Sequence, residues 1–230
     1  MTRVAICIPS GDMVHADFAM SLASLAYHCG PVKLEGKEQP PIDIAIVNVK
    51  DSLIANGRNT LVEKALELDV DYLFFADSDI ALHPWALRQL MAHDKDIVGA
   101  TYVQRNPPHL LLGKGLNGKP LPEWMSGVTI NPSNLMEVAG LPFGCMLVKA
   151  DVFRKTRENF YDLIFQTPQF FHEEADRYLI EGEDYFFCRR AREIGYQVWL
   201  DWSLSFALRH IGQAANMIPA TRIEKEDGDE

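Results

Sequence analysis

Residues 72–79 read YLFFADSD, an apolar run followed directly by an acid-x-acid triplet. The run Tyr72–Ala76 has the length and the apolar, aromatic composition of a buried strand. Asp77 and Asp79 follow where this strand ends, so both carboxylates are expected at the mouth of a cleft. Mg²⁺ and Mn²⁺ prefer oxygen ligands and keep open positions for substrate phosphates. The triplet therefore predicts a clamp for a metal that carries a diphosphate, and the alternative is that Ser78 or Asp79 only starts a turn or caps a helix.

Strand-like and helix-like segments alternate on both sides of this stretch. In the first half we expect strands at 4–8, 42–49, 72–76 and 97–103, and helices at 18–29, 58–66 and 84–91. Such alternation predicts an α/β fold whose mostly parallel sheet is covered by helices on both faces. Ligands of open α/β sheets bind beyond the carboxyl ends of the strands, where both Pro9-Ser10 and Asp77-Ser78-Asp79 are expected.

The second half of the chain has a less regular pattern. Gln104 to Pro132 is rich in Pro, Gly, Asn and Leu and is too long for an ordinary connection, which favours a functional loop. Glu183 to Glu193 is expected to be a helix that Gly195 ends in a left-handed cap. Further strands are expected at 138–141, 145–148, 196–200 and 204–208. We predict one catalytic domain over 1–215 and a solvated acidic tail over 216–230.

Composition and charge limit the classes of protein. The chain has 230 residues, 47% hydrophobic and 23% charged, which is enough material for one sizeable core. A net charge of −10 argues against a protein that binds nucleic-acid backbones. If such an acidic protein acts on an anionic substrate, a cation is needed to bridge the two. The four cysteines lie far apart, the start has no signal-peptide pattern, and no apolar run could span a bilayer. These features predict a cytoplasmic protein with reduced thiols and no membrane span.

Three other sets of residues could carry chemistry. Glu183 and Asp184 open a helix, where the helix dipole favours carboxylates, but one of them could also take a proton from a nucleophilic hydroxyl. His210 follows a strand-like run and is either a structural histidine or a third ligand for Mn²⁺. Arg58 and Asn59, at an expected helix start, could hold an anion or could be a solvated Arg and a capping Asn.

The order of these motifs resembles that of the inverting, family-2-like glycosyltransferases of the GT-A fold. The resemblance extends from Val4 to about Gly212. It rests on Ile6–Pro9, Gly57–Val62, Asp71–Ile80, Phe143–Val148, Gly182–Ala191 and His210–Gly212. The second strand departs from the family, because it ends in Val49-Lys50-Asp51-Ser52 and not in an Asp-rich turn, so the residue that contacts the base is not assigned. The long loop matches nothing that assigns the acceptor.

The resemblance implies a GT-A (Rossmann-like) domain with a small antiparallel element on the acceptor side. It implies a metal-dependent transfer of a sugar, with inversion, from a nucleotide-diphosphate donor (a UDP-sugar foremost) to an acceptor hydroxyl. By the resemblance, Asp77, Asp79 and His210 would hold Mn²⁺ or Mg²⁺, and Asp184 would be the catalytic base with Glu183 beside it. The nucleotide would lie against Pro9, Ser10, Arg58, Asn59, Asp77 and Ser78.

Two other functions remain open at the level of sequence. A sugar-phosphate nucleotidyltransferase also uses an α/β sheet and a metal, but it is expected to carry a Gly-rich, basic loop after the first strand. The segment Pro9-Ser10-Gly11-Asp12 offers one glycine and an acid, which weighs against it. A non-catalytic module that binds nucleotide sugars is the second alternative, and only a test of turnover separates it from an enzyme.

Overall fold

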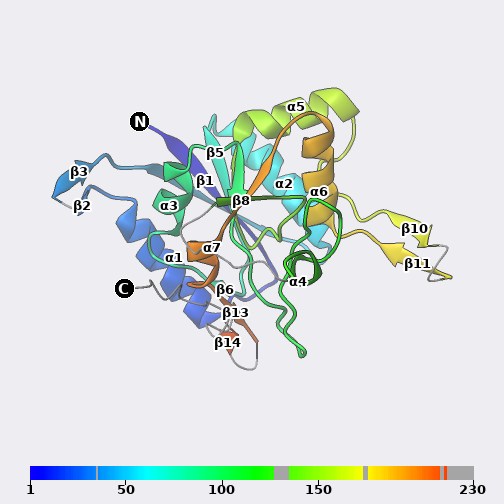
Figure 1. The fold of residues 1–230 in the computed structure, drawn as a ribbon. Coiled ribbons are helices and arrows are strands. Elements are labelled where there is room, and N and C mark those ends of the chain that lie inside the picture. Colours follow the sequence, from blue (N-terminus) through cyan, green and yellow to red (C-terminus); the bar gives the residue numbers. More distant parts are fainter. Residues whose placement is uncertain (35, 127–134, 173–175, 213–214, 217–230) are drawn as a thin grey trace, which may run out of the picture.

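The structure, a computed structural model, describes residues 1–34, 36–126, 135–172, 176–212 and 215–216. Within these residues a central sheet crosses the molecule (Figure 1). It has seven strands, in the order β4-β1-β5-β9-β7-β12-β8. The strands are β1 (Arg3–Ser10), β4 (Asp43–Lys50), β5 (Tyr72–Ala76), β7 (Ile97–Gly99), β8 (Leu135–Val138), β9 (Cys145–Lys149) and β12 (Val198–Asp201).

The sheet is mixed, with a mostly parallel core. β1 is parallel to both β4 and β5, and β12 is parallel to β7. β9 lies between β5 and β7 and is antiparallel to both, and β8 is antiparallel to β12. Consequently β4, β1, β5, β7 and β12 run in one direction, and β9 and β8 run against them. The predicted α/β class is confirmed, with these two reversed strands as the addition that the structure makes.

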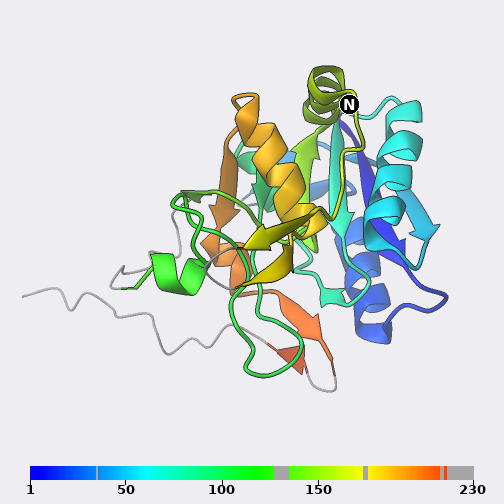
Figure 2. The same cartoon turned by 90° about the vertical axis from the view of Figure 1, so that its right-hand side faces the viewer.

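Helices cover both faces of the sheet (Figures 1 and 2). α1 (Ala16–His28) and α3 (Ala86–Ala92) pack on one face, and α2 (Ile54–Glu67), α5 (Ala150–Phe160) and α6 (Glu183–Glu193) pack on the other. Successive side chains of a strand point to opposite faces. In β1, Ile6 joins the core under α1 and α3, and its neighbour Cys7 joins the core under α2, α5 and α6. Burial on both faces explains the continuous apolar runs of β1 and β5.

Small antiparallel sheets complete the fold. β6 (Ile80–Ala81), β13 (Arg209–Ile211) and β14 (Ala215–Asn216) form one of them, and β13 pairs with β6 so that His210 lies opposite Ile80. β10 (Gln169–His172) pairs with β11 (Arg177–Ile180), and β2 (Val32–Leu34) pairs with β3 (Lys37–Gln39). The sheet of β6, β13 and β14 therefore places His210, a predicted metal ligand, close to the end of β5.

Four expected elements differ from the structure. The expected strand at 97–103 ends already at Gly99, and in place of the expected strand at 138–141 the structure has β8 at Leu135–Val138. α2 begins at Ile54, one turn before the expected start, so Arg58 and Asn59 lie in its second turn and not at its N-terminus. The expected strand at 204–208 is wrong. A short helix, α7 (Trp202–Ser205), begins there because the Asp201 side chain accepts a hydrogen bond from the Leu204 amide at 2.9 Å and caps the turn. The expected left-handed cap is confirmed, since Gly195 has a φ of +95°.

The long loop and the tail are described only in part. A four-residue helix, α4 (Leu121–Trp124), and single bridges such as Val103 with Leu111 give order to 104–126, but 127–134 lie outside the described residues. Of the predicted acidic tail, 217–230 lie outside them as well. All four cysteines are buried and free. Among the helices that the structure describes, none is both long and apolar enough to cross a membrane.

Candidate functional site

A cleft of about 820 Å³ opens at the carboxyl ends of β1 and β5. Three segments form its floor: Pro9-Ser10-Gly11 at the end of β1, Asp77-Ser78-Asp79 after β5, and Asp51-Ser52 before α2. Arg105 and Asn106 enter it from the loop after β7. Pro9-Ser10 and Asp77-Ser78-Asp79, which the sequence places at the ends of the first and third expected strands, both line this cleft.

Asp79 and His210 lie together at this cleft. His210 Nε2 is 3.3 Å from Asp79 Oδ2, and His210 Nδ1 is 2.8 Å from the Val103 carbonyl oxygen, which can only accept a hydrogen bond. The carbonyl therefore holds the ring so that Nε2 points to Asp79. Burial by itself lowers the His210 pKa, but the hydrogen bonds to Asp79 and to Val103 outweigh it and raise this pKa above its ordinary value. Burial by itself raises the Asp79 pKa, but His210 and Arg105 lower it below its ordinary value.

The same two residues fit part of a metal site. A carboxylate oxygen and an imidazole nitrogen whose ring is fixed by a second hydrogen bond suit Mn²⁺, and substrate phosphates could supply further ligands. Asp77 is engaged elsewhere, since its Oδ1 accepts a hydrogen bond from Arg58 at 2.7 Å. In the described part of the chain, no group of three or more His, Cys, Asp or Glu side chains is placed to hold a metal. The structure therefore brings Asp79 and His210 together and leaves Asp77 facing Arg58, and the metal itself stays a prediction.

Arg58 joins the two acidic motifs of the sequence. Its side chain is 3% exposed, with Nη2 at 2.7 Å from Asp77 Oδ1 and Nη1 at 2.5 Å from Glu183 Oε1. The guanidinium carbon lies 5.4 Å from the centre of the Phe143 ring. This guanidinium is buried between two carboxylates in the second turn of α2, not at the helix start where it was expected, and a direct contact with a nucleotide stays a prediction.

Asn59 holds a loop of the protein itself. Its Nδ2 donates to the Phe165 carbonyl at 2.8 Å, and its Oδ1 accepts from the Phe165 amide at 3.0 Å. These paired hydrogen bonds tie α2 to the segment that follows α5. They use both polar groups of the Asn59 amide, so a role in nucleotide binding has no support in this geometry and stays a prediction.

Asp184 lies in the first turn of α6, beside Glu183. Burial and the charge of Glu183 raise the pKa of Asp184 to about 6, against the lowering effect of Arg58. Its Oδ1 also accepts a hydrogen bond from the Tyr185 amide at 2.7 Å. A carboxyl with a pKa in this range can accept a proton near neutral pH and is suited to general base catalysis. Neither acid is among the described residues that line the cleft, and Arg58 links Glu183 to Asp77, which does line it.

Tyr102 also belongs to this site, although no sequence motif pointed to it. Its buried hydroxyl lies 3.5 Å from Asp77 Oδ2 and accepts a hydrogen bond from the Gly144 amide at 3.1 Å. Its ring lies edge to face with His210, with centroids 5.1 Å apart. A Cβ atom on Gly144 would lie 2.4 Å from the Tyr102 hydroxyl, so this close approach requires glycine. The only signal in the sequence was that Tyr102 falls at the end of an expected strand, where ligands of such sheets bind.

Arg105 is a second site residue to which no sequence motif pointed. Its Nη1 lies 3.2 Å from Asp79 Oδ2. Arg105 belongs to the long loop that was expected to be functional, but nothing in the sequence distinguished it from the other residues of that loop. Only the structure shows that this loop brings a cation to the acid-x-acid triplet.

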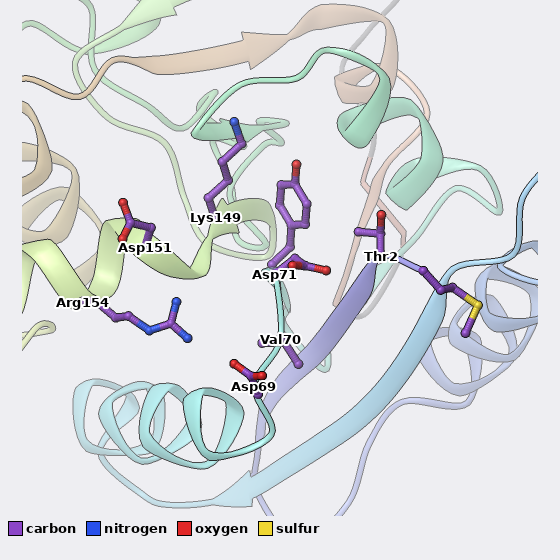
Figure 3. Close-up of a pocket in the computed structure, with 9 residues that line it drawn as sticks. Thr2, Asp69, Val70, Asp71, Lys149, Asp151 and Arg154 are labelled. Atoms are coloured by element: carbon purple, nitrogen blue, oxygen red, sulfur yellow. The ribbon is translucent and has the colours of Figure 1, made fainter.

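A second hollow, of about 660 Å³, lies at the opposite end of β1 and β5 (Figure 3). Lys149, Asp151 and Arg154 face it from β9 and α5, and Asp69 and Asp71 face it from the turn before β5. Lys149 Nζ pairs with Asp96 at 3.0 Å. Because this hollow lies at the amino ends of β1 and β5, it is separate from the cleft that holds the predicted site.

Comparison with known proteins gives a match to one family model and matches to solved structures. The model of the Anp1 family, which is glycosyltransferase-related, matches residues 34–110, the segment that includes Arg58, the acid-x-acid triplet and Arg105. The structure titled "Crystal Structure of A197 from STIV" is similar with a TM-score of 0.53 and 17% sequence identity, over 92% of this chain and 86% of that chain. At this identity the likeness shows the fold, which is consistent with a GT-A-like architecture. A search of curated proteins gives no match. The family match supports a glycosyltransferase-type function at a coarse level.

Proposed function

We propose that this protein is a metal-dependent glycosyltransferase that moves a sugar from a nucleotide-diphosphate donor to an acceptor hydroxyl with inversion. One observation carries the proposal. Arg58 binds Asp77 at the end of β5 and Glu183 at the start of α6, although Arg58 and Glu183 are 125 positions apart. This bridge ties the strand end that carries the acid-x-acid triplet to the helix start that carries Asp184, a carboxyl suited to act as a base. The Anp1 match supports the same class of reaction.

In this proposal the cleft holds the donor. Pro9, Ser10 and Ser78, which line it, would contact the nucleotide, and a UDP-sugar is the first donor to test. Asp79 and His210 would hold Mn²⁺ or Mg²⁺. When bound, such an ion would offset the negative charge that develops on the leaving diphosphate.

Asp184 would act on the acceptor. Its carboxylate takes the proton of the acceptor hydroxyl while that oxygen attacks the anomeric carbon from the face opposite the diphosphate. The new carbon–oxygen bond forms as the bond to the diphosphate breaks, so a single displacement inverts the configuration. Glu183, fixed by Arg58 at 2.5 Å, holds the first turn of α6 in place beside this base.

The released product separates this proposal from its alternatives. Purified protein is incubated with Mn²⁺ and a panel of nucleotide sugars, chosen first by thermal shift because a ligand of the folded state raises its apparent stability. A glycosyltransferase releases a nucleoside diphosphate, by slow hydrolysis or by transfer to an acceptor. A nucleotidyltransferase given a sugar phosphate and a nucleoside triphosphate releases pyrophosphate, and a binding module releases neither. Once an acceptor is known, a product with retained anomeric configuration would overturn the single displacement.

A further inference from the structure

One oxygen of Asp79 faces two nitrogen groups. His210 Nε2 lies 3.3 Å from Asp79 Oδ2, and Arg105 Nη1 lies 3.2 Å from the same oxygen. His210 comes from β13 and is 14% exposed in its side chain, whereas Arg105 comes from an exposed loop and is 53% exposed. Arg105, the more exposed of the two, therefore shares with His210 a carboxylate oxygen for which a cation held by Asp79 and His210 would compete.

The loop that carries Arg105 is fixed at its base. The Gln104 amide donates to the Leu110 carbonyl at 2.8 Å, and the Leu112 amide donates to the Tyr102 carbonyl at 3.0 Å. Tyr102 and Val103, at the start of the loop, are buried, whereas 104–110 are exposed. The two ends of the loop are thus held by the core and by backbone hydrogen bonds, and the Arg105 side chain reaches the cleft from the exposed segment between them.

We propose that Arg105 is a switchable cation of the donor site: it pairs with Asp79 at rest, and a divalent metal at Asp79 displaces its guanidinium onto the donor's diphosphate. This inference rests on the proposed function and names a diphosphate ligand that neither the resemblance nor the family match assigns. It concerns how the site changes between its empty and its loaded form.

Electrostatics gives the direction of the switch. A guanidinium and a divalent ion on one carboxylate oxygen repel each other, so the two compete for Asp79. The displaced guanidinium remains in the same cleft, where a diphosphate offers it the bidentate oxygen geometry that Arg prefers. Metal binding then favours diphosphate binding, and by linkage the diphosphate favours the metal. A half-exposed ion pair adds little to stability, so the Asp79–Arg105 contact can break without disturbing the fold.

The test uses Arg105→Ala, with Arg209→Ala as the matched control. Arg209 is an exposed residue of β13, next to His210, and is not among the described residues that line the cleft. Mn²⁺ alone is titrated against each protein and the free ion is measured by electron paramagnetic resonance. We expect Arg105→Ala to bind Mn²⁺ about two- to fivefold more tightly than wild type, because a weak competitor is gone. We expect Arg209→Ala to match wild type.

The second titration measures UDP at saturating Mn²⁺ by calorimetry. We expect Arg105→Ala to bind UDP about tenfold more weakly, since a charge-assisted hydrogen bond to phosphate is lost. The UDP affinity of Arg105→Lys should fall between those of wild type and Arg105→Ala, because Lys keeps the charge without the planar guanidinium. Tighter Mn²⁺ binding together with weaker UDP binding distinguishes the loss of Arg105 from misfolding, since a variant that merely unfolds loses affinity for both ligands.

Several results would overturn the inference. If wild type binds UDP with Mn²⁺ but Arg105→Ala matches it in UDP affinity, or binds Mn²⁺ no more tightly, Arg105 is not a switch and the proposed function stands. If wild type binds neither Mn²⁺ nor UDP, the proposed function fails and the inference fails with it.

Discussion

Replacing Arg58 by Met tests the bridge between the two acidic motifs. Arg58 is 3% exposed and pairs with Asp77 and Glu183, whose side chains are 22% and 13% exposed. Met keeps the apolar contact with Phe143 and fills most of the volume, but it removes the positive charge and its donors. The two partly buried carboxylates then lose the counter-charge that they share.

The expected loss follows from this burial. Removing one partner of a buried ion pair costs about 3–5 kcal/mol, because the remaining charge stays uncompensated away from water. Arg157→Met provides the matched control, since Arg157 pairs with Glu63 on the surface, where both side chains are about half exposed. An exposed pair contributes only about 0–1 kcal/mol. We therefore expect Arg58→Met to lose at least about 2 kcal/mol more than Arg157→Met.

Urea unfolding, followed by circular dichroism at pH 7, measures both variants against wild type. If Arg58→Met and Arg157→Met lose the same free energy of unfolding, the buried bridge does not hold the site together. Arg58→Lys adds a further check, since it restores the charge but cannot span both carboxylates with a planar fork, and its loss should be intermediate. Turnover gives a second readout. Arg58 lowers the pKa of Asp184, so without it the inflection of the rate profile should move above pH 6.

Three other predictions concern the site. Asp79→Ala should abolish Mn²⁺-dependent binding of a nucleoside diphosphate while the fold survives, and unchanged affinity in calorimetry would contradict the metal assignment. His210→Ala should weaken Mn²⁺ affinity and recover part of its activity at higher Mn²⁺; a lower melting temperature with no rescue would make His210 structural. Asp184→Asn should lower kcat by about 10²–10⁴ with donor affinity near wild type. The wild-type kcat should rise with pH through about 6, because a base must be ionised, and a flat profile would exclude Asp184.

Local patterns in the sequence determined the class of fold and much of the cleft. The apolar run of β5 and the bounds of α6 agree with the structure, because a strand buried on both faces is a continuous apolar run and an amphipathic helix repeats its apolar residues every three to four positions. The place of Asp77 and Asp79 follows from the same run, since residues directly after a buried strand of such a sheet lie at the carboxyl end of that strand, where ligands bind.

Contacts between distant segments were decided by the tertiary structure alone. α2 begins four residues before its expected start, so Arg58 is not at the end of the helix. It is buried instead, and it bridges Asp77 after β5 and Glu183 in α6. The direction of β9 and β8 and the approach of Arg105 to Asp79 are likewise set by how segments pack in space. Periodicity reports which side of an element is buried, but it carries no information about which distant side chain lies opposite. A buried charge such as Arg58 can be recognised only when its partners are in view, because without them the same residue in a helix is expected in water.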